Sequence, residues 1–409
     1  MMESDNKLRH MSFFEEIATL EENSDAWHAA TAGLVTLRLV DAWLGSGAGH
    51  AADDEWNFRG VCATVEKVSE RTLTRQLLTS VLVALRDGKP NVRAVVPSLM
   101  AYAQSLEYEA KWSLASDVYD TLLGHLHPTD DADASIAAQL RLGTCHRHLN
   151  RIDDAVRAFA AASEIGNAVG DMEGILRARL GEARIAILHG NLPQAEVILD
   201  ETIAAASKAD LRDVRSRALH DRSEVARLDS NYELAIRLAY EALHLSQVKS
   251  ERDRILGDIA AAFLSLGVYS AARDAYLVLS VTAQEQYVRW TSMLNLLEVS
   301  SLTGEELLFA QHQKQLLSES LPPYLETVYQ INLGQGYHRL GAPETAHAHL
   351  VLAKALAEEH QLHRLFFIVE ESLTGLQRAT PLHRLSSPAP MDVKEVATAL
   401  QGLREAVGV

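Results

Sequence analysis

The chain has 409 residues, of which 47% are hydrophobic and 23% are charged, the ordinary composition of a folded globular protein. Its 22 glycines and 10 prolines are too few for a turn-rich all-β fold. Acidic residues outnumber basic ones by 55 to 38, which gives a net charge of −17. Such a charge repels phosphate groups and disfavours nucleic acid or an anionic membrane as the main partner.

The cysteine content and the hydropathy indicate the compartment. Cys62 and Cys145 are too few for a disulfide framework, and no Cys-x-x-Cys motif is present. Phe13 and Phe14 are followed at once by Glu15, which is not the pattern of a secretory signal. No segment approaches the ~20 apolar residues that a membrane-spanning helix needs. We therefore expect a cytoplasmic protein that does not enter a membrane.

Apolar residues recur at helical spacing along nearly the whole chain, and no convincing strand alternation occurs. Breaks fall at residues 45–49, 87–90, 127–131, 321–323 and 386–390. Ser12 with Glu15, and Thr303 with Glu306, match the capping box that opens many helices. The sequence therefore predicts an all-α fold, with a helical region over residues 1–106 and an amphipathic helix near the C-terminus.

Aromatic residues gather on both sides of the central region. They are Trp27, Trp43, Trp56 and Phe58 near the start, and Phe366 and Phe367 near the end. We expect them to cap the hydrophobic ends of a repeat array, as terminal repeats must do for solubility. A contact with a partner or with a second copy of the chain is the alternative.

Internal repetition is the clearest signal in the sequence. Residues 142–155, 183–195, 259–272 and 333–346 each read as the end of one helix, a short polar turn and a second helix that opens on alanine. The alanine anchors advance in steps of 40 and then about 37, at Ala115, Ala155, Ala195, Ala235, Ala272, Ala310 and Ala346. A period of this size, containing two helices, is typical of a helical solenoid.

The repeated blocks resemble the tetratricopeptide repeat (TPR) family. The best matches are Leu142, Gly143, Ala155 and Phe159 in one block and Leu333, Gly334, Tyr337, Gly341 and Ala346 in another. The resemblance covers residues 107 to 357 and is weakest between about 285 and 320. It implies a right-handed solenoid of about seven helix-turn-helix repeats over 107–378, followed by a linker and a terminal helix over 379–409.

Motifs of enzyme chemistry are absent from the sequence. It contains no Gly-x-Ser-x-Gly elbow, no His-Glu-x-x-His motif and no P-loop. The His-x-His pairs point to opposite sides of a helix and therefore cannot chelate one ion from one helix face. We predict no enzyme activity, no cofactor and no metal. An enzyme built on a repeat scaffold is the least favoured reading.

Basic residues form the candidate binding site. In proteins of this family the first helix of each pair lines a concave face, and the repeat spacing places eight basic residues there: Arg147, His148, Arg177, Arg184, Arg217, His220, Arg227 and Arg254. Guanidinium groups pair with carboxylates through two parallel hydrogen bonds, so this stripe would suit an acidic peptide. Alternatively, the arginines pair with nearby acids such as Glu182, Asp213 and Glu224.

The leading hypothesis is a non-enzymatic scaffold or adaptor that binds a peptide or protein segment in the concave groove of a TPR superhelix. The alternative is a regulatory or sensor subunit, responsive to a peptide or protein, that controls an effector on another chain. Neither reading involves nucleic acid or a membrane. The sequence leaves the oligomeric state open, a homodimer included.

Overall fold

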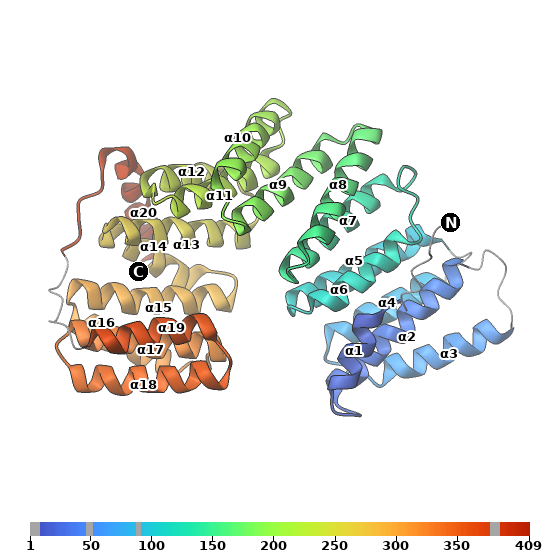
Figure 1. Ribbon diagram of the computed structural model, residues 1–409, viewed down its shortest axis with the longest axis horizontal. Coiled ribbons are helices and arrows are strands. Elements are labelled where there is room, and N and C mark those ends of the chain that lie inside the picture. The colour runs from blue at the N-terminus through green and yellow to red at the C-terminus, as the bar shows by residue number, and fades with distance from the viewer. Residues whose placement is uncertain (1–8, 46–51, 87–90, 377–384) are drawn as a thin grey trace. The chain divides into compact units, whose positions relative to one another are not determined.

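The computed structural model describes residues 9–45, 52–86, 91–376 and 385–409 (Figure 1). Apart from one 3₁₀ turn, the regular elements in these ranges are α-helices, so the all-α prediction is confirmed. The chain divides into two compact units, residues 1–209 and 210–409. This division lies inside the predicted array over 107–378, and the domain boundaries predicted from the sequence stay predictions.

The first unit contains ten helices among its described residues (Figure 1). They are α1 (Met11–Thr19), α2 (Asp25–Gly45), α3 (Ala52–Glu66), α4 (Leu73–Arg86), α5 (Val92–Tyr108), α6 (Trp112–Leu123), α7 (Ala132–His148), α8 (Ile152–Val169), α9 (Met172–Leu188) and α10 (Leu192–Lys208).

The second unit contains ten helices and the 3₁₀ turn in the part that the structure describes. They are α11 (Arg212–Leu228), α12 (Tyr232–Leu245), α13 (Lys249–Leu266), α14 (Tyr269–Thr282), α15 (Gln286–Thr303), α16 (Glu306–Leu317), α17 (Pro323–Arg339), α18 (Pro343–Glu359), α19 (His363–Gly375), η1 (Met391–Val393) and α20 (Lys394–Val407).

Consecutive helices from α5 to α18 pack as helical hairpins, which gives seven helix pairs among the described residues. Each pair turns through one residue with a left-handed backbone. These residues are Ala110, Asn150, Gly190, Ser230, Gly267, Gly304 and Gly341. These residues are spaced 40 and then 37 residues apart, the same spacing as the alanine anchors in the sequence. The predicted number of repeats is confirmed.

Neighbouring pairs are held together by large side chains packed against glycine. The ring of Phe159 on α8 lies against Gly143 on α7 and Gly181 on α9, where an added Cβ would come within 2.7 and 2.5 Å of it. Leu350 on α18 lies against Gly334 on α17 within one pair of the second unit. The contact of Phe159 with Gly181 removes apolar surface that a single helix pair would leave exposed to water.

Six of the seven predicted alanine anchors are buried in second helices: Ala115, Ala155, Ala195, Ala235, Ala272 and Ala346. The prediction for Ala310 is wrong, because this residue is exposed on α16. The buried residue is Phe309, 37 residues from both Ala272 and Ala346. Its large ring fits because Gly336 of α17 faces it, with an added Cβ only 2.4 Å away.

The two predicted capping boxes do not form. Helix α1 follows His10, which makes no side-chain cap, and Ser12 lies inside the helix. Ser12 instead bonds through its backbone nitrogen and its hydroxyl to Asp117, at 3.0 and 3.1 Å. Thr303 is the last residue of α15, and α16 begins after Glu305 without a side-chain cap.

The predicted aromatic caps have mixed environments. Trp43 is buried and stacks on Phe58 at a ring distance of 5.2 Å, within a core to which α1 to α8 contribute. Phe366 is partly buried, and Lys354 lies over its ring. Phe367 is 71% exposed. The side chain of Trp56 lies outside the described residues.

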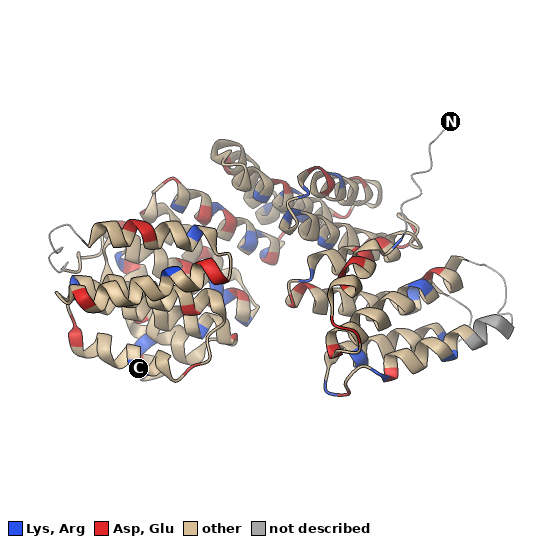
Figure 2. Cartoon of the chain, turned by 60° about the horizontal axis from the view of Figure 1, so that its bottom comes forward, with Lys and Arg blue, Asp and Glu red and all other residues tan. Residues whose placement is uncertain are grey.

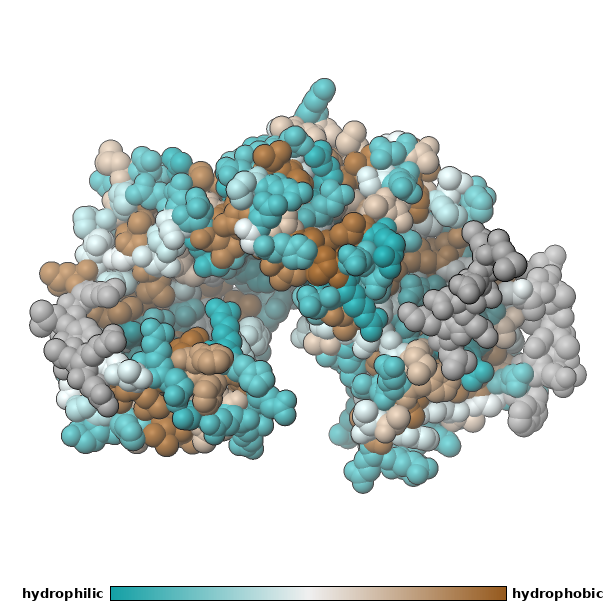
Figure 3. Space-filling view, in the orientation of Figure 1, coloured by the Kyte–Doolittle hydropathy of each residue, from teal (hydrophilic) through white to brown (hydrophobic). Residues whose placement is uncertain are grey.

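Apolar groups remain scattered between polar ones on the face seen in Figure 3. Among the helices that the structure describes, none combines the length and the apolar character needed to cross a bilayer.

The turn residues give a test of the repeat geometry. Ala110 has φ of 58°, a conformation that costs an L-residue ~1–2 kcal/mol, so Ala110→Gly should raise the free energy of unfolding by about 1 kcal/mol. Gly190 has φ of 71° with open space around it, so Gly190→Ala should lower that free energy by about 1 kcal/mol. Urea denaturation measures both changes in the free energy of unfolding. Two changes of the same sign would contradict this turn geometry.

Candidate functional site

Three of the predicted basic residues come together in the first unit. Arg147 and His148 end α7, and Arg184 lies in the second half of α9. A guanidinium nitrogen of Arg147 donates to Nε2 of His148 at 3.0 Å. Burial lowers the pKa of His148, and the positive charges of Arg147 and Arg184 lower it further. His148 is therefore mainly neutral near pH 7, as an acceptor of this hydrogen bond must be.

An aromatic side chain that is not among the predicted site residues completes this cluster. The indole of Trp112, the first residue of α6, stacks on the His148 ring at 4.0 Å with 7° between the planes. The stack fixes the imidazole beside Arg147. We call Trp112, Arg147, His148 and Arg184 the basic cluster.

Arg177 lies on α9, seven residues before Arg184, so the two share one helix face. Its guanidinium is 3.8 Å from the carboxylate of Glu173, a long contact between partly exposed groups. An exposed pair of this kind contributes little to stability.

The predicted basic residues of the second unit have different surroundings. Arg217 lies between Asp213 and Glu251, at 3.1 and 2.9 Å. These pairs are of the kind that the alternative interpretation of the sequence describes. Lysine and arginine are interspersed with acids along the helices in Figure 2.

The other three basic residues of this unit differ among themselves. His220 contacts Asp258 at 2.6 Å. Arg227 bonds to both carboxylate oxygens of Glu224 at 2.6 Å, and this hydrogen bonding raises the pKa of the arginine. Arg254 is exposed on α13. The assignment of all eight residues to a binding face stays a prediction.

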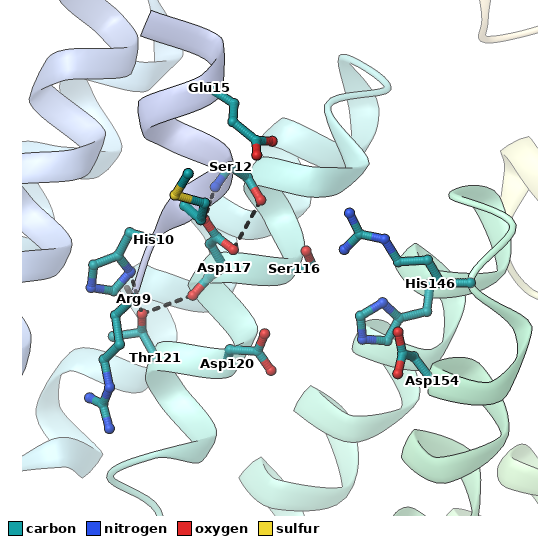
Figure 4. Close-up of a pocket in the computed structure, with 12 residues that line it drawn as sticks. Arg9, His10, Ser12, Glu15, Ser116, Asp117, Asp120, Thr121, His146 and Asp154 are labelled. Carbon is teal, nitrogen blue, oxygen red and sulfur yellow. Dashed lines mark hydrogen bonds between the residues drawn. The ribbon is translucent and has the colours of Figure 1, made fainter. Parts of the chain in front are cut away.

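A second candidate site is an open cavity of about 700 Å³ in the first unit (Figure 4). Its lining comes from the start of α1, from α6, from the end of α7 and from the start of α8. The twelve residues are Arg9, His10, Met11, Ser12, Glu15, Ser116, Asp117, Asp120, Thr121, His146, Arg151 and Asp154.

Hydrogen bonds hold the chain segment before α1 at the rim of this cavity. His10 contacts Asp41 through Nε2 at 3.0 Å and Thr121 through Nδ1 at 3.4 Å. Asp41 also contacts Arg9 at 3.0 Å and His125 at 2.7 Å. Burial tends to raise the pKa of Asp41, but the hydrogen bonds from His10, His125 and Arg9 hold it far below the usual range.

Carboxylates dominate the floor of the cavity. Asp117, Asp120 and Asp154 come from α6 and α8, as Figure 4 shows. Burial and the negative charges of Asp117 and Asp154 raise the pKa of Asp120 to about 6. Burial also raises the pKa of Asp117 and lowers that of His146. Within the described residues, no group of three or more histidine, cysteine or acidic side chains is arranged to hold a metal ion.

The sequence carries no local signal for this cavity. Asp117 and Asp120 are three residues apart on a helix, a spacing that is common on solvated surfaces and therefore carries little signal. The cavity depends on residues 9–12 folding back onto α6, a contact across more than a hundred residues of sequence.

Comparisons with known proteins agree with the fold. No protein-family model matches the chain, and no curated protein matches it. A signal transduction ATPase with numerous domains (STAND) protein with a tetratricopeptide repeat sensor, from Pyrococcus horikoshii, is similar with a TM-score of 0.51 and 12% identity. The match covers 90% of this chain and 68% of that one.

Two Rap proteins match at lower TM-scores. One is a Rap protein complexed with competence and sporulation factor, at a TM-score of 0.46 and 11% identity, covering 85% of this chain and 97% of that one. The other is the Rap conjugation gene regulator of the plasmid pLS20 with the Phr* peptide, at 0.40 and 11%, covering 84% and 98%. Taken with the seven helix pairs, the STAND match identifies a TPR-type helical repeat fold.

The raised pKa of Asp120 gives a pH prediction. Between about pH 4 and 6 the folded chain keeps a proton on Asp120 that the unfolded chain has lost, so the stability that this proton contributes falls as the pH rises through this range. Asp120→Asn should therefore stabilise the protein relative to wild type more at pH 7 than at pH 4. Urea denaturation across this range measures the difference, and a constant difference would contradict the raised pKa.

Proposed function

We propose that this chain is a non-enzymatic scaffold or adaptor that binds an acidic peptide or protein segment on the first helices of its repeat pairs. The observation that supports this most is the basic cluster. Arg147 and Arg184 both act on His148 as positive charges, so an anionic group placed there would interact with all of them.

The chemistry of the cluster suits a carboxylate. Each arginine presents several N–H donors in a planar fork, which matches the two oxygens of a carboxylate. The neutral His148, held against Trp112, supplies a flat surface beside these donors. The net charge of −17 would repel an acidic ligand elsewhere, so a local basic site would also fix where it docks.

In this proposal Arg177 extends the site along α9, and Arg254 is an exposed donor of the second unit. Arg217, His220 and Arg227 of the second unit each contact a carboxylate, as Arg177 does, so an acidic ligand would exchange one carboxylate partner for another at these positions.

A regulatory or sensor subunit is the second candidate function. The observation that favours it is a helix of the chain itself, α20, packed on the second helices α12 and α14. A ligand that displaced α20 would break this contact, so ligand binding would change the conformation of the chain.

Peptide binding tests the proposal. The probes are two fluorescein-labelled pools of nine-residue peptides, one with Glu or Asp and the other with Lys or Arg at alternate positions. We expect the full-length chain to bind the acidic pool more tightly, and Arg147→Glu with Arg184→Glu to weaken that binding at least ~10-fold, about 1.4 kcal/mol. Fluorescence anisotropy at two salt concentrations measures both.

The matched control is Lys67→Glu with Lys208→Glu, which changes the net charge equally at two exposed positions, after α3 and at the end of α10. Binding should stay within ~2-fold of wild type, since neither residue belongs to the basic cluster and salt screens more distant surface charges. Equal weakening by both double variants, or no preference for the acidic pool, would contradict the proposal.

A further inference from the structure

The terminal helix α20 lies on the second helices α12 and α14 of the second unit (Figure 1). The segment before it is tied to the start of α14. The backbone nitrogen of Ser387 donates to the carbonyl of Gly267 at 2.9 Å, and the hydroxyl of Ser386 accepts from the backbone nitrogen of Ser270 at 3.2 Å. The helix therefore packs on two second helices that precede it by more than a hundred residues.

Helix α14 has two buried faces, unlike the second helices α10 and α18. Eight of its 14 residues are buried, against four of 17 in both α10 and α18. Ala272, Tyr276 and Leu279 follow the spacing of a core-facing stripe. Ala271, Asp274 and Val278 form a second stripe, at spacings of three and four, on the side that α20 contacts. We call this second stripe with the adjoining side of α12 the α12/α14 groove.

The face of α20 complements that stripe. Val393, Val396 and Leu400 are buried and follow one another at spacings of three and four. One turn further on, Arg404 donates to a carboxylate oxygen of Asp274 at 2.7 Å. Aliphatic side chains in this series, laid into a groove between helices, are a recurring mode of peptide recognition.

Asp274 makes the groove selective. Only 7% of this residue is exposed, and a buried carboxylate needs a positive partner to remain charged. Burial raises the pKa of Asp274, while Arg404 and Arg273 lower it and Glu405 raises it. Arg273 bonds to Glu305, so the direct partner of Asp274 is the cation that α20 brings.

The packing of α20 is also limited. Leu403 is 39% exposed, and Leu385 and Met391 before the helix are 93% and 84% exposed. Among the described residues, its main contacts are with α12, α14 and η1, and the later helices α15 to α19 lie outside this interface. Few buried side chains hold the helix, which is a condition for exchange with a competitor.

We propose that the α12/α14 groove is a binding site for an amphipathic helix of a partner protein, and that α20 occupies it in the same chain until such a helix displaces it. The partner helix carries aliphatic side chains at spacings of three and four, with an arginine or lysine one turn later. This site is on second helices and does not depend on the peptide site proposed for the first unit.

The test uses the full-length chain and a labelled peptide of residues 389–409 as the probe for a competing helix. Arg404→Glu on the chain places a carboxylate beside Asp274 and should release α20. The probe, which keeps its arginine, should then bind at least 10-fold more tightly to this variant than to the wild-type chain. Adding Asp274→Arg restores an ion pair of reversed polarity between the groove and the variant chain's own α20, and should abolish probe binding again.

The matched control is Lys394→Glu, the same charge change at an exposed position of α20, which should leave probe binding at the wild-type level. Amide hydrogen exchange of α20 provides a second readout. Exchange should quicken in Arg404→Glu and return towards the wild-type rate in the double variant.

Three results would overturn the proposal. In the first, α20 exchanges freely in Arg404→Glu but the probe does not bind. In the second, α20 stays as protected as in wild type and the probe is excluded, which would make α20 a permanent part of the fold. In the third, light scattering shows that the Arg404→Glu variant dimerises through exchanged α20 helices and the probe does not compete. The groove would then bind a second copy of the chain instead of a partner protein.

Discussion

The fold depends on one packing constraint: a pair of helices cannot bury both of its faces and must share a large side chain with the next pair. In the first unit, Phe159 fills the space against Gly143 and Gly181, and both glycines are needed because any Cβ would overlap the ring. In the second unit, Phe309 on α16 meets Gly336 on α17 of the next pair in the same way. What recurs along the chain is therefore a contact between a large residue and a small one. The two helices of each pair are joined by a turn that contains one residue with a left-handed backbone.

This constraint also determines where binding surfaces arise. The core-facing positions of each helix are buried against neighbouring helices. Only the outward sides of the first and second helices can therefore contact a ligand or a partner. On the first helices of the first unit, this side carries the basic cluster around His148. On the second helices of the second unit, the side of α14 that carries Asp274 takes α20. The two proposals thus use different sides of the same kind of helix pair.

Much of the fold could be predicted from the sequence, because the repeat period is visible in local features. These are the alanine anchors, the turn residues and the helical spacing of hydrophobic residues. Ala310 was assigned wrongly because exchanging an alanine anchor for Phe309 is acceptable only with Gly336, and this pairing is a contact between helix pairs. The cap at Ser12 failed for a similar reason, since its hydroxyl prefers Asp117, far along the chain.

The sites were less predictable than the fold. Sequence spacing placed Arg147, His148 and Arg184 in successive first helices, and the structure brings them together. Spacing could not show which arginines meet carboxylates, because Arg217 and Glu251 are paired only by the packing of α11 near α13. The cavity beside α1 and the docking of α20 rest on contacts between distant segments, for which a single sequence holds no local signal.

The most direct test of the packing constraint is a double-mutant cycle on Phe309 and Gly336. In the wild-type background, Gly336→Ala places a Cβ 2.4 Å from the Phe309 ring and should destabilise the protein by ~1–3 kcal/mol. In the Phe309→Ala background the overlap with the ring is gone and the nearest remaining contact, to Cβ of Ser301, is 3.3 Å, so the same change should stabilise by up to ~0.5–1 kcal/mol, the usual advantage of alanine over glycine in a helix. The account predicts this reversal of sign in urea denaturation, and an equal effect of Gly336→Ala in both backgrounds would contradict it.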